Sequence, residues 1–249
     1  MSSVMAALRL GMATVEELGD LILRYHKGRL ELYEPGASGC GVYVDFVNGP
    51  VGYRRRSGHD RRQPLALAIG RRRGPMTVVD ATAGLARDSF LLACLGCRVI
   101  AVERSPVLGE LIHDGLARAS ADAGPRLEQV LSRISLIVAD ARDALGEMTD
   151  ESAPDVVYLD PMYPPTRKSA LAGKEMRICR RLVGDDGDCG ALFAAALRSA
   201  RRRVVVKRRR HAQPLGPNPT RTYDGTSVRY DVYLTKARRH GETPAFGGA

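Results

Sequence analysis

Residues 77–103 read TVVDATAGLARDSFLLACLGCRVIAVE, and this stretch decides the fold. It begins with a short apolar run at Thr77–Asp80, passes through small residues into Asp88–Leu95, and ends with a second apolar run at Arg98–Glu103. Short apolar runs bounded by tight turns are typical of buried strands, and the segment between them has the pattern of a helix. The stretch therefore predicts a β–α–β unit with two parallel strands.

The same alternation continues along the chain to residue 234. Further helices are predicted at Pro106–Ala119 and Leu192–Ala200, and further strands at Ser135–Asp140, Val156–Asp160, Arg203–Lys207 and Val228–Leu234. Near-continuous apolar strands between amphipathic helices indicate a mostly parallel sheet that is covered on both faces. The predicted fold class is α/β, a doubly wound Rossmann-like sheet with a late antiparallel strand. Its ligand crevice is expected at the carboxyl ends of the strands.

The residues before this unit have a different pattern. Leu30–Tyr33 and Gly41–Phe46 alternate in hydrophobicity and predict a small hairpin or antiparallel sheet, while Pro64–Gly70 predicts a short helix. The expected organisation is a small, basic N-terminal α+β or β subdomain at 1–74, a main domain at 75–236 and a flexible tail at 237–249.

The net charge of +10 and the sequence pI of about 9.7 come mostly from arginine. The arginine runs are Arg54–Arg56, Arg61–Arg62, Arg71–Arg73, Arg201–Arg203 and Arg208–Arg210. Arginine forks match phosphate geometry and stack on bases, so the charge favours a polyanion partner. A simple role in solubility, or a GC-rich coding sequence, would explain the same runs.

Five cysteines, an odd number, are scattered through the chain. Cys94 and Cys97 have the spacing of a metal-binding pair, but no second pair matches them, so we expect buried structural thiols and no metal site. This cysteine usage fits a reducing, cytoplasmic compartment. No apolar stretch approaches the ~18 residues of a membrane span, and the N-terminus has no signal-peptide pattern, so no membrane association is expected.

The loop after the first strand of the unit is made of small residues. Asp80 ends the strand, Gly84 lies in the turn, and Asp88 opens the helix. Small side chains let a ligand approach the backbone, and a helix N-terminus offers free amides. A single glycine departs from the G-x-G-x-x-G of dinucleotide-binding loops, and an ordinary tight turn would look the same.

Acidic residues end the next two strands. Glu103 is placed to bind ribose hydroxyls, or else it is an exposed acid paired with Arg104. Together with the loop before it, Glu103 points to an adenosine-containing cofactor, which both nicotinamide enzymes and class I methyltransferases use. Asp140 is placed equally well to accept from an adenine amino group or to cap the helix that begins near Arg142.

The last predicted site follows Val156–Asp160, where the sequence reads Asp160-Pro161-Met162-Tyr163-Pro164-Pro165. Prolines stiffen this loop and remove backbone donors, which leaves carbonyls facing the pocket. Asp160 and the Pro161 region would accept hydrogen bonds from an exocyclic amine, and Tyr163 would stack on an extruded base. This arrangement suits methylation of an amine, because orienting the nitrogen supplies much of the rate. A proline-rich turn capped by Asp160 is the alternative.

The chain resembles the ribosomal small-subunit methyltransferase J family from about Leu30 to Leu234. The resemblance is carried by VVDATAGLARDSFLLACLGCRVIAVERSPV, DGLARA, VVYLDPMYP, KSALAGKEMR, RRVVVKR and VDFVNGPVGYRRRSG. It implies a class I fold, S-adenosylmethionine as cofactor and methyl transfer to N2 of a guanine in 16S rRNA, as free RNA or in the small subunit.

By the same motifs, the resemblance implies roles for individual residues. Cofactor contacts would come from Arg87 and Asp88, from Glu103 and Arg104, and from Asp140 and Ala141, which stand where the family has small hydroxyl residues. Asp160 would lie between the cofactor and the target amine, and Tyr163 replaces a phenylalanine while keeping the stacking face. With the first loop included, the expected cofactor residues are Asp80, Gly84, Arg87, Asp88, Glu103, Arg104, Asp140, Ala141 and Asp160.

Basic residues around the predicted amine-binding loop are candidates for contacts with RNA phosphates. They are Arg54, Arg55, Lys168, Lys174, Arg177, Lys207 and Arg208. A nicotinamide-dependent oxidoreductase would need a full glycine fingerprint and a catalytic Tyr-x-x-x-Lys or histidine, and neither is present. A non-catalytic RNA-binding assembly factor would explain the arginines but not the acids at successive strand ends. Methyltransferases that act on amines of DNA or protein use similar loops.

Overall fold

The computed structural model describes residues 15–18, 20–37, 41–48, 63–71, 74–161, 174–183 and 187–235. The strands are β1 Val15–Leu18, β2 Leu21–His26, β3 Arg29–Tyr33, β4 Thr77–Asp80, β5 Arg98–Glu103, β6 Ile134–Val138, β7 Val156–Leu159, β8 Arg203–Arg209, β9 Arg221–Asp224 and β10 Val228–Leu234. The helices are α3 Pro64–Ile69, α4 Arg87–Cys94, α5 Pro106–Ala121, α6 Pro125–Leu131, α7 Ala141–Gly146, α8 Lys174–Val183 and α9 Cys189–Ser199.

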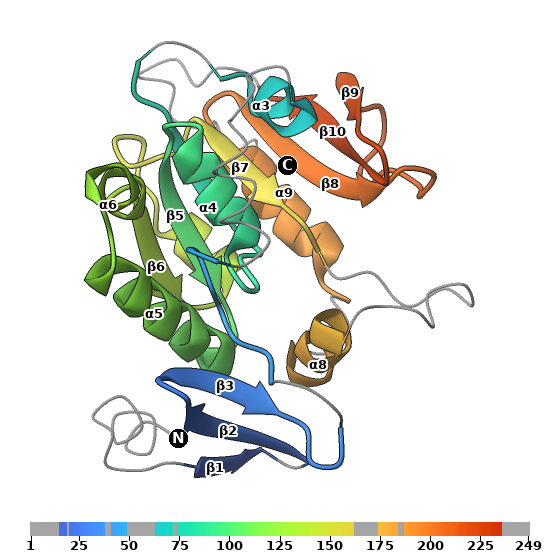
Figure 1. Ribbon diagram of the computed structural model, residues 1–249. Coiled ribbons are helices and arrows are strands. Elements are labelled where there is room, and N and C mark those ends of the chain that lie inside the picture. Colours follow the sequence, from blue (N-terminus) through green and yellow to red (C-terminus); the bar gives the residue numbers. More distant parts are fainter. Residues whose placement is uncertain are drawn as a thin grey trace.

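Seven strands form the main sheet in the order β6-β5-β4-β7-β8-β10-β9 (Figure 1). The five strands from β6 to β8 are parallel, whereas β10 runs antiparallel to both β8 and β9. The chain moves outward on one side of β4 and then returns to add β7 on the other side. This reversal at β4 is the topological switch point where open α/β sheets bind their ligands.

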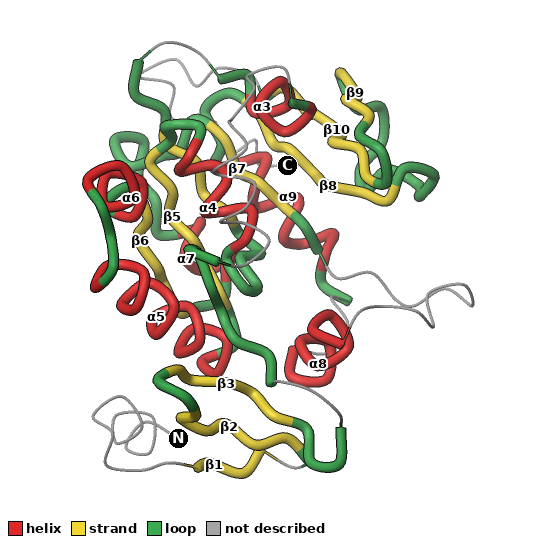
Figure 2. Tube along the Cα trace, viewed as in Figure 1, coloured by secondary structure: helices red, strands yellow, loops and turns green. Residues whose placement is uncertain are grey.

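Alternation along the strands separates two apolar cores, one on each face of the sheet. Val78, Tyr158 and Val205 pack in the core that includes α3, α4, α5 and α6. Their neighbours in sequence, Val79 and Leu159, pack in the core that includes α7 and α9. Helices thus cover both faces, as the tube in Figure 2 shows. The predicted doubly wound, mostly parallel α/β sheet with a late antiparallel strand is confirmed.

The N-terminal strands form a separate antiparallel sheet in the order β1-β2-β3, which lies against α5 and near α8 (Figure 1). Of the two predicted alternatives, the antiparallel sheet is present for Leu30–Tyr33, whose main partner is β2. A hairpin of Leu30–Tyr33 with Gly41–Phe46 is wrong. Only Leu32 and Val42 form a bridge between the two predicted strands, with reciprocal hydrogen bonds of 2.8 Å.

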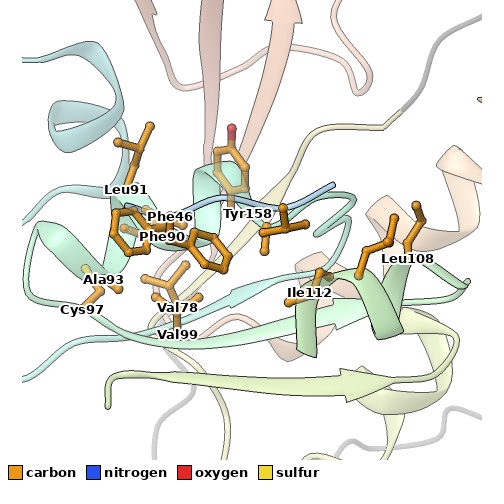
Figure 3. Packing of buried hydrophobic residues seen from close by; sticks show 14 of the residues in the cluster. Phe46, Val78, Phe90, Leu91, Ala93, Cys97, Val99, Leu108, Ile112 and Tyr158 are labelled. Carbon is orange, nitrogen blue, oxygen red and sulfur yellow. The ribbon is translucent and has the colours of Figure 1, made fainter. Parts of the chain in front are cut away.

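After Val42 the chain leaves β3 and packs across the helices instead. Phe46 stacks on Phe90 of α4 with ring centroids 5.0 Å apart (Figure 3). Val44 lies so close to α5 that a Cβ on Gly115 would approach its Cγ1 to 2.6 Å. This burial fixes the segment on the main domain, and it explains why alternation in Gly41–Phe46 does not produce a paired strand.

The short helix predicted at Pro64–Gly70 is confirmed as α3, which ends at Gly70 in the left-handed conformation. This helix contacts β8, β9 and β10 of the main sheet. The predicted boundaries of the domains remain predictions.

Candidate active site

Asp80 ends β4, and its side chain is buried beneath the loop that follows. Ser89 Oγ donates a 2.5 Å hydrogen bond to Asp80 Oδ2, and the backbone nitrogen of Thr82 donates one of 3.3 Å to Oδ1. Burial raises the pKa of Asp80 to about 7, although the hydrogen bond from Ser89 acts in the opposite direction. Asp80 is only 1% exposed, and its hydrogen bonds to Ser89 and Thr82 order the loop.

The turn between β4 and α4 uses two residues in the left-handed region. Gly84 has φ +56°, and Ala86, the N-cap of α4, has φ +54°. A Cβ on Gly84 would have only the carbonyl oxygen of Thr82 within reach, at 4.0 Å. The space over Gly84 is therefore open to a ligand, as small residues in this loop predicted.

Glu103 connects this turn to the loop after β5. One carboxylate oxygen accepts from the backbone nitrogen of Gly84 and the other from that of Ser105, both at 2.8 Å. The side chain is 5% exposed, so Glu103 is not the exposed acid of the alternative reading. Arg104 Nη1 instead lies 3.7 Å from Oδ1 of Asp188, the residue before α9.

Asp140 is the N-cap of α7, because its Oδ1 accepts a 2.8 Å hydrogen bond from the backbone nitrogen of Arg142. The guanidinium of Arg142 also donates to Asp140 and lowers the pKa of that carboxyl. The capping role of Asp140 is thus confirmed, and Ala141 follows as the first residue of the helix.

Asp160 follows β7 and is held by neighbours on both sides. Its backbone nitrogen donates a 2.6 Å hydrogen bond to Thr82 Oγ1, and its Oδ2 accepts one of 2.8 Å from Lys207 Nζ. Lys207 Nζ also lies 2.7 Å from Asp88 Oδ2, which accepts a further 2.6 Å bond from the hydroxyl of Tyr158. Asp88 is therefore part of a side-chain network that reaches Asp160.

One pocket collects residues from all of these strand ends. It is lined by Ala81, Thr82, Gly84, Val102, Glu103, Arg104, Asp140, Ala141, Arg142, Asp160, Asp188 and Leu192. Six of the predicted cofactor residues line it, namely Gly84, Glu103, Arg104, Asp140, Ala141 and Asp160. It lies beside β4, where the strand order reverses.

The chemistry of this pocket fits S-adenosylmethionine. Four carboxylates, from Glu103, Asp140, Asp160 and Asp188, line the pocket, and S-adenosylmethionine carries ribose hydroxyls, an adenine amino group and positive charge. Carboxylates are acceptors for all of these groups, and the open backbone at Gly84 leaves room for the ligand to approach.

Arg87 opens α4 and points toward α8, where its Nη2 lies 2.5 Å from Glu175 Oε2. On the same helix, Arg177 lies 3.1 Å from Glu34, and Arg181 pairs with both Glu34 and Asp20. These ion pairs connect α8 to α4 and to the N-terminal sheet. Each is partly or largely exposed, so each adds little to stability.

The residues predicted to bind RNA fall into three groups. Arg54, Arg55 and Lys168 lie outside the described residues, as does the side chain of Lys174 at the start of α8. Tyr163, which was predicted to stack on the target base, also lies outside them. Arg177 is exposed. Lys207 lies between two carboxylates, and Arg208 is only 7% exposed and donates to the carbonyl oxygen of Gln213. Their surroundings argue against the phosphate contacts predicted for Lys207 and Arg208.

Six residues that line the pocket were not among the predicted site residues, namely Ala81, Thr82, Val102, Arg142, Asp188 and Leu192. Arg142 and Asp188 form the rim of the pocket, where Arg142 Nη1 lies 3.4 Å from Asp188 Oδ2. Lys207 was predicted to bind RNA and not to belong to the site. The position of Lys207 at the end of a predicted strand beside Val156–Asp160 was the one signal that could have found it. Among the described side chains, no group of three or more His, Cys, Asp or Glu could hold a metal ion.

Comparison with known proteins agrees with this geometry. Residues 5–235 match the model of the SAM-dependent methyltransferase family. Proteins named ribosomal RNA small subunit methyltransferase J are 49% identical in Thioalkalivibrio sulfidiphilus, covering 86% of this chain and 84% of that protein, and 44% identical in Pseudomonas fluorescens, covering 93% and 89%.

A solved SAM-dependent methyltransferase from Neisseria gonorrhoeae is 32% identical, with a TM-score of 0.70 over 100% of this chain and 96% of that one. Within the described part of the chain, no helix has the length and apolar composition needed to cross a membrane. Because the family model spans most of the chain and the relatives share nearly half of its residues, the protein belongs to the S-adenosylmethionine-dependent methyltransferases, in the ribosomal RNA small subunit methyltransferase J family.

Proposed function

We propose that this protein transfers a methyl group from S-adenosylmethionine to the exocyclic N2 amine of a guanine in the 16S rRNA of the small ribosomal subunit. The observation that carries the proposal is the position of Asp160 at the end of β7, on the same pocket as Glu103 and Asp140. The identity of up to 49% to relatives named for small-subunit rRNA methylation supports the choice of substrate.

The proposed mechanism assigns one task to each strand end. S-adenosylmethionine supplies an electrophilic methyl group when it is bound. Glu103 accepts hydrogen bonds from ribose hydroxyls, and Asp140 accepts from the adenine amine while it continues to cap α7. Asp160 and the Pro161 carbonyl accept from the N–H groups of the target amine, which directs the nitrogen lone pair toward the methyl carbon.

Asp160 acts by orientation in this mechanism. A neutral aromatic amine is nucleophilic enough to displace a sulfonium leaving group once it is aligned, and proximity supplies much of the rate. As the N–C bond forms and the S–C bond breaks, the amine would release one proton, which would pass along its hydrogen bond to the Asp160 carboxylate and then to solvent. Tyr163 would stack on the extruded guanine, as the sequence predicts.

RNA would be held in part by the exposed Arg177, which would exchange its 3.1 Å ion pair with Glu34 for a phosphate. Arg177 lies on α8, which is joined to the start of α4 by the pair of Glu175 with Arg87. We keep Arg54, Arg55, Lys168 and Lys174 as proposed phosphate contacts. A substrate of this kind also places the protein in the cytoplasm, where ribosomal subunits are assembled.

The proposal is tested by incubating the purified protein with S-adenosylmethionine and unmodified 16S rRNA or small subunits, and then identifying methylated nucleosides by mass spectrometry. We expect N2-methylguanosine with the wild-type protein. Asp160→Ala should form none while its affinity for S-adenosylmethionine is weakened but measurable. Full activity of Asp160→Ala would remove Asp160 from the mechanism, and methylation of another amine would overturn the substrate.

A further inference from the structure

Lys207 lies at the centre of a hydrogen-bond network that has no role in the mechanism described so far. Its Nζ lies 2.7 Å from Asp88 Oδ2 and 2.8 Å from Asp160 Oδ2. The lysine side chain is 22% exposed and that of Asp88 is 15% exposed, whereas that of Asp160 is 40% exposed. The network therefore runs from the interior to the carboxylate at the pocket.

The fold brings these residues together through the register of the sheet. Leu159 of β7 pairs with Val206 of β8, so the next residues, Asp160 just after β7 and Lys207 within β8, lie side by side. Tyr158, two residues before Asp160, points toward the α4 face, where its hydroxyl donates to Asp88. Three elements that are separated in the sequence, α4, β7 and β8, thus contribute to one set of hydrogen bonds.

The charges require a cation at this point. Asp88 and Asp160 both approach the same nitrogen within hydrogen-bond distance, so their carboxylates are close enough to repel each other. Burial by itself lowers the pKa of Lys207, but the carboxylates of Asp160 and Asp88 outweigh it and raise the pKa above its ordinary value. Lys207 therefore stays protonated in any usual assay buffer and cannot act as a base.

We propose that Lys207 is a positioning residue for methyl transfer, which holds the Asp160 carboxylate in the orientation that receives the target amine. Asp88 and Tyr158 hold the lysine from the interior side. Asp88 then acts on Asp160 through Lys207, in place of the direct cofactor contact that its motif implies. This inference rests on the proposed function, because it gives Asp160 the role stated there.

The inference predicts a specific kinetic pattern. In the proposed mechanism, Glu103 and Asp140 bind the adenosine part of the cofactor. The side-chain hydrogen bonds of Lys207 go to Asp88 and Asp160 instead. Loss of the ammonium should therefore reduce the rate of methyl transfer at saturating RNA and cofactor. Because the Asp160 carboxylate stays in the pocket, cofactor affinity should change less than in Asp160→Ala. Misplacement of a reacting group by about 1 Å costs on the order of 100-fold in rate.

The experiment compares Lys207→Met and Lys207→Arg with wild type in single-turnover methylation of 16S rRNA. We expect Lys207→Met to lower the rate by about 100-fold, with the dissociation constant for S-adenosylmethionine within about 3-fold of wild type. Lys207→Arg keeps the positive charge and should recover at least about a tenth of the wild-type rate. Arg98→Met, at the opposite end of the strands, removes one exposed positive charge and is the matched control.

Other outcomes would overturn the inference. An unchanged rate at saturating RNA, combined with weaker RNA binding and a lower salt dependence, would make Lys207 a phosphate contact instead. Equal activity of the Met and Arg variants would exclude the charge as the cause.

A second variant covers failure of Lys207→Met to fold. Tyr158→Phe keeps the buried ring and removes only the hydroxyl that holds Asp88. We expect it to lower the transfer rate several-fold without a change in cofactor affinity, and an unchanged rate would contradict the network. If wild type itself fails to methylate 16S rRNA, the proposed function fails; if only the variants behave otherwise, the inference about Lys207 fails alone.

Discussion

Glu103 shows how one side chain can both order the site and bind its ligand. Its two oxygens accept from backbone nitrogens of adjacent loops, which fixes the carboxylate at the wall of the pocket. A carboxylate that is fixed before the ligand arrives loses little entropy on binding.

Glu103→Ala is therefore expected to weaken binding of S-adenosylmethionine. A hydrogen bond to a charged group contributes ~1.5–3 kcal/mol, which corresponds to a loss of roughly 10- to 150-fold in affinity. Isothermal titration calorimetry measures the dissociation constant directly, and Glu128→Ala on the exposed face of α6 serves as the control. An unchanged constant for Glu103→Ala would remove it from the ribose role.

Asp80 should make stability depend on pH. Its pKa is about 7 in the folded protein and near 3.8 in the unfolded chain, because burial disfavours the charged form. The folded state therefore binds the extra proton between these values, so the free energy of unfolding falls as pH rises through this window and levels off above about 7.

The test is denaturant unfolding of wild type and Asp80→Asn between about pH 5 and 8. The variant cannot ionise at this position and should lack this part of the pH dependence. Across the whole window the contribution of Asp80 is on the order of 4 kcal/mol, at 1.36 kcal/mol per pKa unit. Parallel curves for the two proteins would show that Asp80 does not titrate there.

Among the helices and strands, the hydrophobic pattern predicted those strands whose side chains are buried in a core. β4, β5 and β10 have the bounds that the sequence predicts. In β4 and β5 nearly continuous apolar residues face a core on each side, whereas β10 alternates between apolar and polar residues. β9 was missed, since its sequence RTYD is polar and lies at the edge of the sheet. The hairpin at Gly41–Phe46 was mispaired because its apolar residues are buried against helices that are distant in sequence.

The acids at the strand ends could be predicted for the same reason. Glu103 and Asp160 follow apolar strands directly, so their place in the crevice follows from the order of the chain. The pairing of Lys207 with Asp88 depends on which strands are neighbours and on side-chain rotamers, and a single sequence specifies neither.

The packing of residues 42–46 on α5 can be tested at Gly115. A Cβ there would lie 2.6 Å from Val44 Cγ1 and 2.7 Å from Val44 Cβ, and the latter atom moves only with the backbone. Alanine improves helix propensity by about 1 kcal/mol, but the overpacking costs typically 1–3 kcal/mol. We expect Gly115→Ala to destabilise the protein in urea unfolding.

Gly146→Ala is the matched control for this substitution. Gly146 also lies in a helix, but nothing approaches the position of its Cβ within 4 Å. It should be neutral or slightly stabilising. If Gly115→Ala behaved in the same way, the close approach of residues 42–46 to α5 would be incorrect.

For the whole molecule, the net charge of +10 is the property that matters most for an RNA substrate. Binding to phosphates releases counterions, so the logarithm of affinity falls linearly with the logarithm of salt concentration. If about four phosphates are contacted, RNA affinity should fall on the order of 100-fold between roughly 50 and 200 mM salt.

Filter binding at several salt concentrations measures this slope. Arg177→Ala should reduce its magnitude by about 1, as expected for one phosphate contact, whereas Arg98→Ala should leave it unchanged. Equal slopes for Arg177→Ala and wild type would show that α8 does not face the RNA through this residue.

We propose that the pocket at the strand ends serves to methylate one guanine in 16S rRNA. Mass spectrometry of 16S rRNA from a strain that lacks the protein tests it most directly. We expect the loss of one N2-methylguanosine, restored by the wild-type protein and not by Asp160→Ala. An unchanged set of 16S rRNA modifications in the deletion strain would contradict it.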